Sequence, residues 1–352
     1  MPAIKLPNVR RRIRDTEARV DAALSNVPRI TNETVAEHRE DVLKSARKYI
    51  YPLQHSRHRI VRISLALLVS TVVIFFVYCG LALYKFQSTN GFIYGVSKVL
   101  PFPVAKAGPR WISYESYLFE LKRNMHYYQS QQQANFTTKE GKSQLQRLKK
   151  QAIAQVTQDA YVKELAERNH VTVSDRSVNG AVMLVRSQNR LGSNDRVFRE
   201  VLNQFWGWRE ADFKRELHGQ LLQQAVVTKL DTASSTRAAG VLVQLKGGAD
   251  FAATAAATSD DISTKGSGGQ YANPITQTDR DIAPQITAEL FRLQPGQTSE
   301  VINTGYTLEI VKAIDRTGTV MHGAHIQFNL QPINNYVKPL QATQKPHTYI
   351  KF

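Results

Sequence analysis

The sequence predicts an α+β protein with an N-terminal arm, a single membrane-length helix, an all-α domain and a C-terminal antiparallel sheet flanked by helices. Three observations predict this class. The apolar run from Ile63 to Tyr84 contains no charged residue. Helical periodicity then dominates as far as Lys229. From Ser235 onward glycine and threonine become frequent, and short β-rich runs replace the long helices.

The apolar run is long enough to cross a bilayer as a helix, because a rise of 1.5 Å per residue gives roughly 30 Å. Arginines and lysines crowd its N-terminal flank, whereas only Lys85 and Lys98 follow soon after it. The positive-inside bias predicts a cytoplasmic arm over residues 1–62 and an extracytoplasmic body after the run. A cleaved signal peptide is the alternative, but its apolar core is normally about 7–15 residues. We therefore expect an uncleaved signal anchor over residues 63–84 that places the chain in the cell membrane.

The formal net charge is +17, and much of it lies before the apolar run. A basic arm is attracted to anionic lipid, with a gain on the order of 1 kcal/mol for each basic residue near the surface. Nucleic-acid binding is the alternative explanation of such charge. However, Asp15, Glu17 and Asp21 interrupt the arm, and no recognition motif accompanies it. Membrane lipid is the expected partner, and no nucleic acid is expected.

The only cysteine, Cys79, lies inside the apolar run. The body after the run is therefore expected to have no disulfide and no thiolate metal site. The sequence lacks the G-x-S-x-G, H-E-x-x-H and phosphate-loop motifs. Asp260 and Asp261, like Glu115 and Glu120, are interpreted as helix-surface carboxylates. No cofactor and no metal are expected.

Residues 85–234 are predicted to form a helical domain of about five helices. Apolar residues recur at i, i+3, i+4 and i+7 spacing in this region. The expected helices are Ile112–Gln133, Lys142–Asn169, Ser174–Arg190, one that begins at Asn194 or Asp195 and ends at Gly207, and Trp208–Lys229.

Residues 235–330 are predicted to form the domain that contains the sheet. Helices are expected over Arg237–Lys246, Phe251–Thr258 and Ile286–Leu293, and strands over Glu300–Asn303, Tyr306–Ile314 and His322–Leu330. Residues 331–352 contain Pro332, Pro339 and Pro346 and are predicted to be an unpacked tail.

Several pieces of residues 248–312 occur in the order found in parvulin-type, or PpiC-type, peptidyl-prolyl isomerase domains. They are GADFAATAAATSDD, GSGGQYANP, ELFRLQPGQTSEVINT and GYTLEIVKA. The block from Leu290 to Glu300 is the most specific piece, and several pieces in one order are stronger than any one alone. This region therefore resembles a parvulin domain.

The helical region resembles the chaperone domain of SurA/PrsA-type foldases. It carries VAKAGPRWISYESYLFEL, VTVSDRSVNGAV and a last helix that opens with G-W-x-x-x-D-F-K-x-x-L. The two resemblances imply a membrane-anchored extracytoplasmic folding factor, a peptidyl-prolyl isomerase and chaperone whose partners are unfolded or nascent secreted polypeptides. The alternative is a non-enzymatic holdase with a degenerate parvulin domain.

The sequence departs from the parvulin pattern at three places. The family's first strand, A-x-H-I-L-V, is missing before the Arg237 helix, and a close match, Gly323–Ile326, follows the last strand instead. We infer a circular permutation in which His322–Asn329 pairs antiparallel with Tyr306–Lys312 in the centre of one sheet. A truncated second domain, or a chance match, is the alternative. In addition, Thr307 replaces a family histidine, and QYA replaces D-L-G in the second strand.

Prolyl isomerisation twists an amide over a barrier of about 20 kcal/mol and breaks no bond, so an apolar pocket and placed hydrogen bonds are sufficient. By resemblance, Ile282, Ile286 and Phe291 line the proline pocket. His325 is the inward histidine, and Thr307 is within reach of it. The same apolar residues also suit any helix core, and a strand histidine is often only hydrogen-bonded. Because of the replaced residues, we expect weak or absent isomerase activity.

Overall fold

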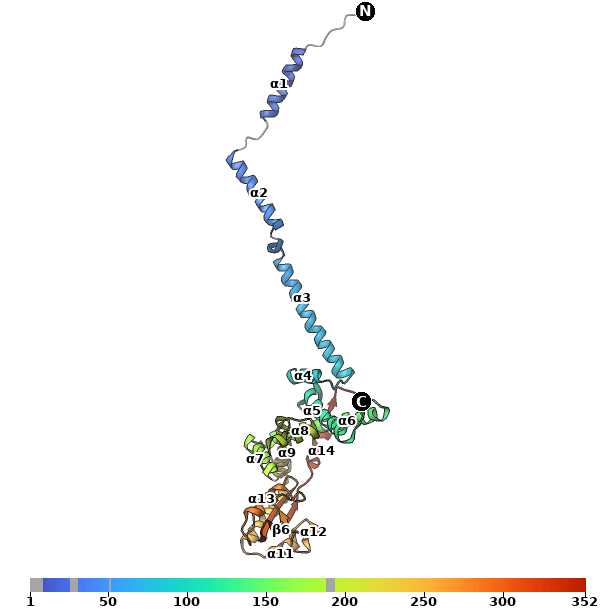
Figure 1. Cartoon of the computed structure of the whole chain (residues 1–352), viewed down its shortest axis with the longest axis vertical. Coiled ribbons are helices and arrows are strands. Elements are labelled where there is room, and N and C mark those ends of the chain that lie inside the picture. Colours follow the sequence, from blue (N-terminus) through green and yellow to red (C-terminus); the bar gives the residue numbers. More distant parts are fainter. Residues whose placement is uncertain (1–8, 26–30, 51, 188–193) are drawn as a thin grey trace, which may run out of the picture. The chain divides into compact units, whose positions relative to one another are not determined.

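The computed structural model describes residues 9–25, 31–50, 52–187 and 194–352. It divides into two compact units, Met1–Tyr78 and Cys79–Phe352, and each is described by itself. Among its described residues, the first unit contains α1 (Val9–Ser25), α2 (Asn32–Ile50) and most of α3 (Pro52–Gly80) (Figure 1).

In the part of the chain that the structure describes, one helix is long and apolar enough to cross a membrane, and it runs from Arg59 to Lys85. It comprises most of α3, from Arg59 onward, and the π-helical turn η1 (Leu81–Lys85). Two polar side chains inside the apolar run bond to their own helix, since the hydroxyls of Ser70 and Thr71 donate to backbone carbonyls four residues earlier at 2.7 and 2.8 Å. A bilayer tolerates hydroxyls that are satisfied in this way. The single apolar helix predicted from the sequence is confirmed.

The helical part of the second unit contains six helices and one small sheet among the described residues. The elements are α4 (Gly91–Val99), β1 (Pro103–Ala107), β2 (Arg110–Ser113), α5 (Tyr114–Gln132), α6 (Lys139–Arg168), α7 (Asp175–Ser187), α8 (Asp195–Trp206) and α9 (Glu210–Leu230). The predicted end of one helix at Arg190 lies outside the described residues. The five predicted helices otherwise correspond to α5–α9, whereas α4 was missed because its nine residues lie between turn-rich segments.

The helical core forms because each helix buries one apolar stripe. Ser113 caps α5 by accepting a hydrogen bond from the Ser116 backbone N–H at 3.1 Å. The stripe that follows, including Tyr114, Tyr117 and Leu121, is buried against α6. A second aromatic cluster ties α5 to the start of α9, where the Phe119 and Trp208 rings stack with centroids 5.7 Å apart.

The last 22 residues are packed, so the prediction of an unpacked tail is wrong. They form α14 (Asn334–Thr343), which contacts α6, and β7 (His347–Thr348), which pairs antiparallel with β1 in the order β2-β1-β7. Val337 and Ile350 are buried in the main core. The prolines are accommodated in this packing: Pro339 lies inside α14, and β7 is a two-residue strand at the edge of its sheet.

The remaining elements form a four-stranded antiparallel sheet with helices on both faces. The strand order is β3-β6-β5-β4. The elements are α10 (Thr232–Lys246), α11 (Phe251–Thr258), α12 (Ile262–Lys265), β3 (Ile275–Thr276), α13 (Pro284–Arg292), β4 (Ile302–Asn303), β5 (Thr307–Thr317) and β6 (Val320–Asn329). The α+β class predicted from the sequence is confirmed.

The predicted central pairing is also confirmed. β6 lies between β5 and β3, and its register with β5 places Leu308 opposite Phe328 and Val311 opposite His325. Residues alternate between the two faces of the sheet. On one face, the side chains of Ile310 and Ile326 pack in the main core with those of α10 and α11. On the other face, α13 covers the half of β5 and β6 around Ala313, and the half around His325 carries the candidate site.

The segment that enters the sheet domain and the segment that leaves it meet at Asp231. Asp231 is buried, and its two carboxylate oxygens accept hydrogen bonds from the backbone N–H groups of Ser234 at 3.0 Å and Gln331 at 2.8 Å. The Ser234 hydroxyl donates to the Asn329 carbonyl at 2.9 Å. The segment that enters the sheet domain is therefore bonded to the segment that leaves it.

Candidate functional site

A buried histidine between two carboxylates forms the centre of the candidate site. His325 on β6 is 5 % exposed. Its Nδ1 lies 2.9 Å from Glu309 Oε2 on β5, and its Nε2 lies 2.9 Å from Asp261 Oδ2 at the start of α12. Thr264 Oγ1 is also 2.9 Å from Nε2. Both ring nitrogens therefore have partners, an arrangement that suits the doubly protonated imidazolium.

The loop before α12 holds Asp261 in place. Its Oδ1 caps the helix by accepting from the backbone N–H of Ser263 at 2.9 Å and from the hydroxyl of that residue at 2.7 Å. Its Oδ2 accepts from the Thr264 hydroxyl at 2.6 Å. Ser259 is buried, and its hydroxyl accepts from the Gln327 backbone N–H at 3.1 Å, which fixes the loop to β6. The carboxylate is thus positioned by the helix cap and by the strand that carries His325.

The charges of the site follow from this geometry. Burial favours the neutral form of His325, but hydrogen bonds and charges from Glu309 and Asp261 outweigh it and raise the pKa of the imidazole. Burial also favours protonation of Asp261, but hydrogen bonds from Thr264, Ser263 and His325 outweigh it and lower the pKa of this carboxyl to about 2. Asp261 is therefore an anion at neutral pH.

Thr307, which the sequence places near His325, does not contact it. The Thr307 hydroxyl lies 2.8 Å from Glu309 Oε1 and 2.7 Å from the Thr304 hydroxyl. Glu309 Oε2 in turn contacts His325. Thr307 and His325 are thus linked through one carboxylate that the sequence comparison did not single out.

An aromatic ring covers the histidine. The Tyr271 ring stacks on the His325 imidazole with centroids 4.5 Å apart, and burial raises the pKa of the Tyr271 hydroxyl. The Gly269–Tyr271 segment is held by β6, since the His325 N–H donates to the Gly269 carbonyl at 2.8 Å and the Tyr271 N–H donates to the Gly323 carbonyl at 3.0 Å. Gly269 has φ +82°, and a Cβ there would clash with the His325 carbonyl oxygen.

The three predicted pocket residues lie in one apolar cluster with Tyr271. Ile286 is buried in it, beside Ile275, Leu290 and Val311. Ile282 and Phe291 are only partly buried and pack at its margin. The structure therefore brings Ile282, Phe291 and Tyr271 together as the accessible members of one apolar cluster, with Ile286 beneath them.

The sequence analysis missed Asp261 and Glu309. Asp261 was interpreted as a helix-surface carboxylate, whereas it bonds to a buried histidine; Asp260, beside it, accepts from Arg237 at 2.7 Å. A signal was present in each case. Glu309 interrupts the otherwise apolar stretch of a central strand, and Asp261 precedes a Ser-Thr pair at helix-cap spacing. No group of three or more His, Cys, Asp and Glu side chains suited to a metal occurs among the described residues.

The helical domain contains a separate cavity of about 420 Å³ between β2, α5, α6 and α9. Trp111, Phe119 and Leu222 supply apolar walls, and Glu120 and Asp159 supply carboxyl groups. Burial raises the pKa of both carboxyls. A cavity with apolar walls and a few polar groups can take side chains of an extended polypeptide.

Two family models match the chain, one over its helical region and one over most of its sheet domain. A SurA-like N-terminal domain matches residues 53–227, and a PPIC-type PPIase domain matches residues 221–315. The second match ends before β6, and α14 and β7 lie beyond both matches. No curated protein matches the chain. Because the two domains occur in one polypeptide in this order, the chain belongs to the SurA/PrsA-type foldases that carry a parvulin domain of the PpiC type.

Proposed function

We propose that the chain is a membrane-anchored extracytoplasmic folding factor. The helical domain holds unfolded secreted polypeptides, and the sheet face around His325 isomerises their X–Pro bonds. The chaperone and isomerase domains of the family support this function. The observation that carries the isomerase assignment is the charged cluster of His325, Asp261 and Glu309. Tyr271, which stacks on His325, joins it to the apolar cluster on which Ile282 and Phe291 pack. Buried charged clusters of this kind occur preferentially at functional sites.

In this proposal Asp261 is the catalytic group. The planar amide is stabilised by a resonance form that places negative charge on the carbonyl oxygen. A carboxylate held beside that oxygen disfavours this form and so favours the twisted amide, with no bond broken and no proton moved. The low pKa of Asp261 keeps it ionised for this role. His325 is a positioning residue, because both of its nitrogens are occupied within the protein.

The proline ring in this proposal rests on Phe291, Ile282 and Tyr271. An apolar surface of this kind binds the ring and removes water from the amide, which lowers the barrier further. Ile286 supports the surface from within the core. Thr307 acts only through Glu309, which is consistent with a modest turnover.

The isomerase assignment is tested by measuring cis–trans exchange of an X–Pro peptide by NMR with the full chain in lipid nanodiscs. We expect slow but measurable catalysis, and Phe291→Ala should reduce it at least tenfold. Val243→Ala, an exposed position on α10, is the matched control and should leave the rate unchanged. Equal rates for Phe291→Ala and the wild type would show that the pocket is elsewhere.

A second candidate is a holdase without isomerase activity. Thr307 in place of a histidine, and the cavity of about 420 Å³ in the helical domain, favour it. This candidate predicts suppression of the aggregation of an unfolded protein and no catalysed exchange. Failure of the chain to bind unfolded polypeptides at all would remove both candidates.

We infer that the sheet domain is circularly permuted, with β6 as the displaced first strand. The central position of β6 and the short turn through Gly318 between β5 and β6 support this inference. Truncation after Thr319 removes β6 and should unfold the sheet, because it exposes the ladder groups of both neighbours. Truncation after Gln331 keeps β6 and should leave the sheet folded. If the first truncation also left the sheet folded, the inference would fail.

The anchored topology is tested by adding a protease to sealed cells or vesicles from the outer side. Residues after Lys85 should be digested and the basic arm should be protected, because the Lys and Arg bias before Ile63 predicts a cytoplasmic arm. Protection of the body instead of the arm would reverse the topology.

A further inference from the structure

The end of the apolar helix is built into the helical domain. Leu83 is buried in the main core, and its carbonyl accepts a hydrogen bond from the buried Tyr114 hydroxyl at 2.5 Å. The Ser88 backbone N–H donates to the Ala82 carbonyl at 2.8 Å. The last turn of the membrane-length helix therefore belongs to the same compact unit as the helical domain.

Helix α4 follows this turn and has one buried and one exposed apolar face. Asn90 caps it, accepting from the Phe92 backbone N–H at 2.9 Å. Ile93 and Ser97, four residues apart, are buried against the domain. Phe92 and Val99, seven residues apart on the opposite face, are 58 % and 80 % exposed. A helix that shows apolar side chains on its outer face needs another apolar phase to cover them.

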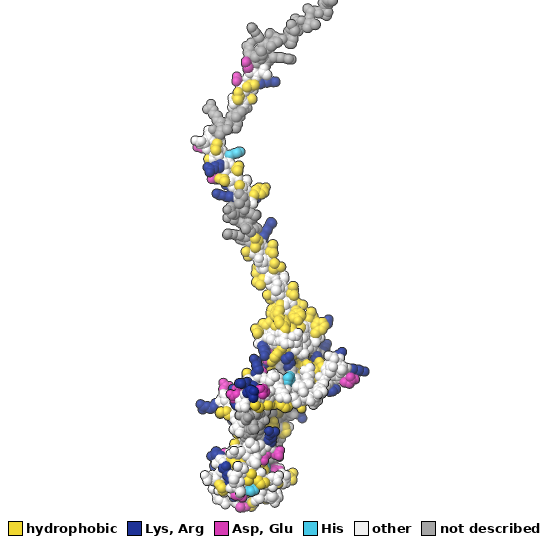
Figure 2. Space-filling model, viewed as in Figure 1, with side chains coloured by type: hydrophobic (Ala, Val, Ile, Leu, Met, Phe, Trp, Pro, Cys, Tyr) yellow, Lys and Arg dark blue, Asp and Glu magenta, His cyan; other side chains and the backbone are white. Residues whose placement is uncertain are grey.

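Further exposed aromatic residues lie at the same end of the unit. Phe86, directly after η1, is 68 % exposed, and Lys85 lies beside its ring. Gln87 binds the Lys351 carbonyl through its amide at 2.6 Å, which brings the partly exposed Phe352 to this end. Figure 1 draws α4 and the C-terminus at the same end of the second unit, and Figure 2 shows hydrophobic side chains gathered at this end.

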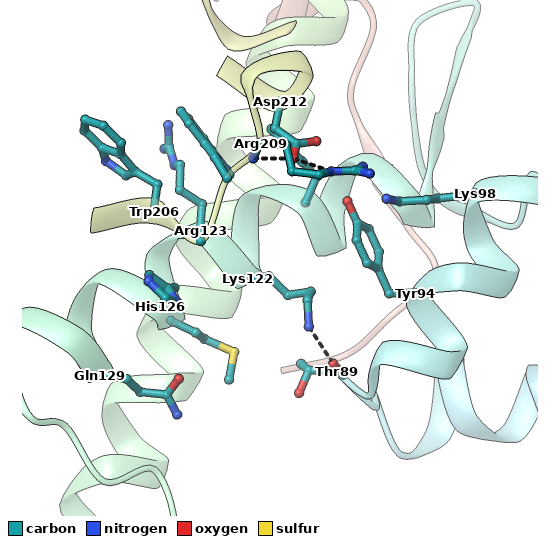
Figure 3. Close-up of a pocket in the computed structure, with 14 residues that line it drawn as sticks. Thr89, Tyr94, Lys98, Lys122, Arg123, His126, Gln129, Trp206, Arg209 and Asp212 are labelled. Atoms are coloured by element: carbon teal, nitrogen blue, oxygen red, sulfur yellow. Dashed lines mark hydrogen bonds and ion pairs between the residues drawn. The ribbon is translucent and has the colours of Figure 1, made fainter. Parts of the chain in front are cut away.

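A cavity of about 490 Å³ opens next to α4 and carries positive charge (Figure 3). Lys98 and Lys122 flank the Tyr94 ring, 4.3 and 5.6 Å from its centre. Among the described residues that line the cavity, Asp212 is the only acidic side chain, and it pairs with Arg209 at 3.6 Å. Tyrosine and tryptophan, the latter present as Trp206 and Trp208, are the side chains enriched at membrane–water interfaces.

We propose that α4 and Phe86 seat the helical domain on the outer leaflet of the membrane, where Lys98 and Lys122 meet the phosphates of anionic phospholipid headgroups. The proposal rests on the anchor in the proposed function. Continuity with the apolar helix is the reason to choose a lipid partner over a client polypeptide, because η1, in which that helix ends, and α4 contribute to the same buried core.

The seating is tested with the full chain in nanodiscs that contain phosphatidylcholine and phosphatidylglycerol. Cys79 is replaced by alanine, and single cysteines at positions 74, 99 and 243 carry a bimane fluorophore. A fraction of the lipid carries a nitroxide in the acyl chain. We expect nitroxide lipid to quench the label at position 99 at least twofold more than the label at 243, which lies on α10. The label at Ile74→Cys, within the apolar helix, reports separately whether this helix is inserted in the lipid.

The outcomes separate the seating from the anchor. Quenching at position 74 without quenching at 99 would overturn the seating and leave the anchor intact. No quenching at either position would overturn the anchor and the seating together. If an unfolded polypeptide shields position 99 from aqueous iodide and lipid does not, the face is a client surface and the seating is overturned.

Two sets of variants test the named residues. Phe92→Asp should abolish the extra quenching at position 99, whereas Tyr306→Asp, at an even more exposed aromatic position directly before β5, should not. Lys98→Ala combined with Lys122→Ala should reduce quenching at position 99 at least twofold in discs with phosphatidylglycerol and leave it unchanged in phosphatidylcholine alone. If the protein that keeps Lys98 and Lys122 showed equal quenching at position 99 in both kinds of disc, the proposed contact with anionic headgroups would be overturned.

Discussion

His325 and Glu309 are diagonal neighbours on two adjacent strands, with His325 Nδ1 2.9 Å from Glu309 Oε2 and both side chains buried. The other ring nitrogen, Nε2, lies 2.9 Å from Asp261 Oδ2. One cationic side chain therefore joins the central hairpin of the sheet to the loop before α12. This arrangement makes His325 a structural as well as a positioning residue.

Replacing the histidine should weaken the fold of the sheet domain. His325→Ala leaves Glu309 buried without its cation, and breaking a buried ion pair costs about 3 kcal/mol. His322→Ala, three residues earlier on β6 and partly exposed, should change the free energy of unfolding by less than about 0.5 kcal/mol. Urea unfolding monitored by hydrogen exchange of the β6 amides checks the difference. Equal protection in the two variants would mean that the pair does not contribute to stability.

The stability of the sheet domain should depend on pH in two windows. The raised pKa of His325 gives a contribution that is complete below the unfolded value of about 6.5 and disappears as pH rises through the folded pKa. The lowered pKa of Asp261 gives about 2 kcal/mol that is complete above 3.8 and disappears as pH falls toward 2. The difference in unfolding free energy between the wild type and His325→Gln should therefore be largest at about pH 4–6 and shrink at higher pH. A difference that grows with pH would contradict the charged state assigned to His325.

Gly269 should tolerate no side chain. Because Gly269 has a φ of +82°, Gly269→Ala strains the backbone. Because the His325 carbonyl oxygen is so close, the added Cβ also separates the Gly269–Tyr271 segment from β6. Gly248→Ala is the matched control, because Gly248 has φ +93° with open space around it. We expect the control to cost about 1 kcal/mol and Gly269→Ala to cost clearly more in thermal unfolding. Similar losses of stability in the two variants would show that the Gly269–Tyr271 segment can move away from β6 without further cost.

The C-terminal segment should stabilise the helical domain. Ile350 is 2 % exposed in the main core, so Ile350→Ala should cost about 2–4 kcal/mol. Ile262→Ala removes the same atoms from a side chain that is 89 % exposed and should be almost neutral. Hydrogen exchange of the β1 amides should rise only in the first variant. Unchanged hydrogen exchange of the β1 amides in Ile350→Ala would mean that residues 331–352 are as weakly packed as the sequence predicted.

Local patterns were sufficient to predict several elements. The uncharged run from Ile63 to Tyr84 and the apolar spacing along α5, α6 and α9 specify helices without knowledge of their partners. The pairing of β6 with β5 was predicted because the Gly323–Ile326 motif follows the last strand across a short turn.

Long-range contacts were not predictable from those patterns. Ile350 becomes buried only because β7 pairs with β1, far earlier in the chain. The partnership of His325 with Glu309, and not with Thr307, depends on the register that places Val311 opposite His325. Asp261 and His325 meet only after the loop before α12 folds against β6.

The proposed isomerase mechanism requires that ionised Asp261 catalyses the twist of the X–Pro amide. Its most direct test is the cis–trans exchange rate of an X–Pro peptide with Asp261→Asn in the full chain. Asp281→Asn, an exposed position, serves as the matched control. We expect at least a tenfold loss of the catalysed rate for Asp261→Asn with the β6 amides still protected, and no loss for the control. A rate unchanged in Asp261→Asn, or no catalysis by the wild type, would contradict the claim.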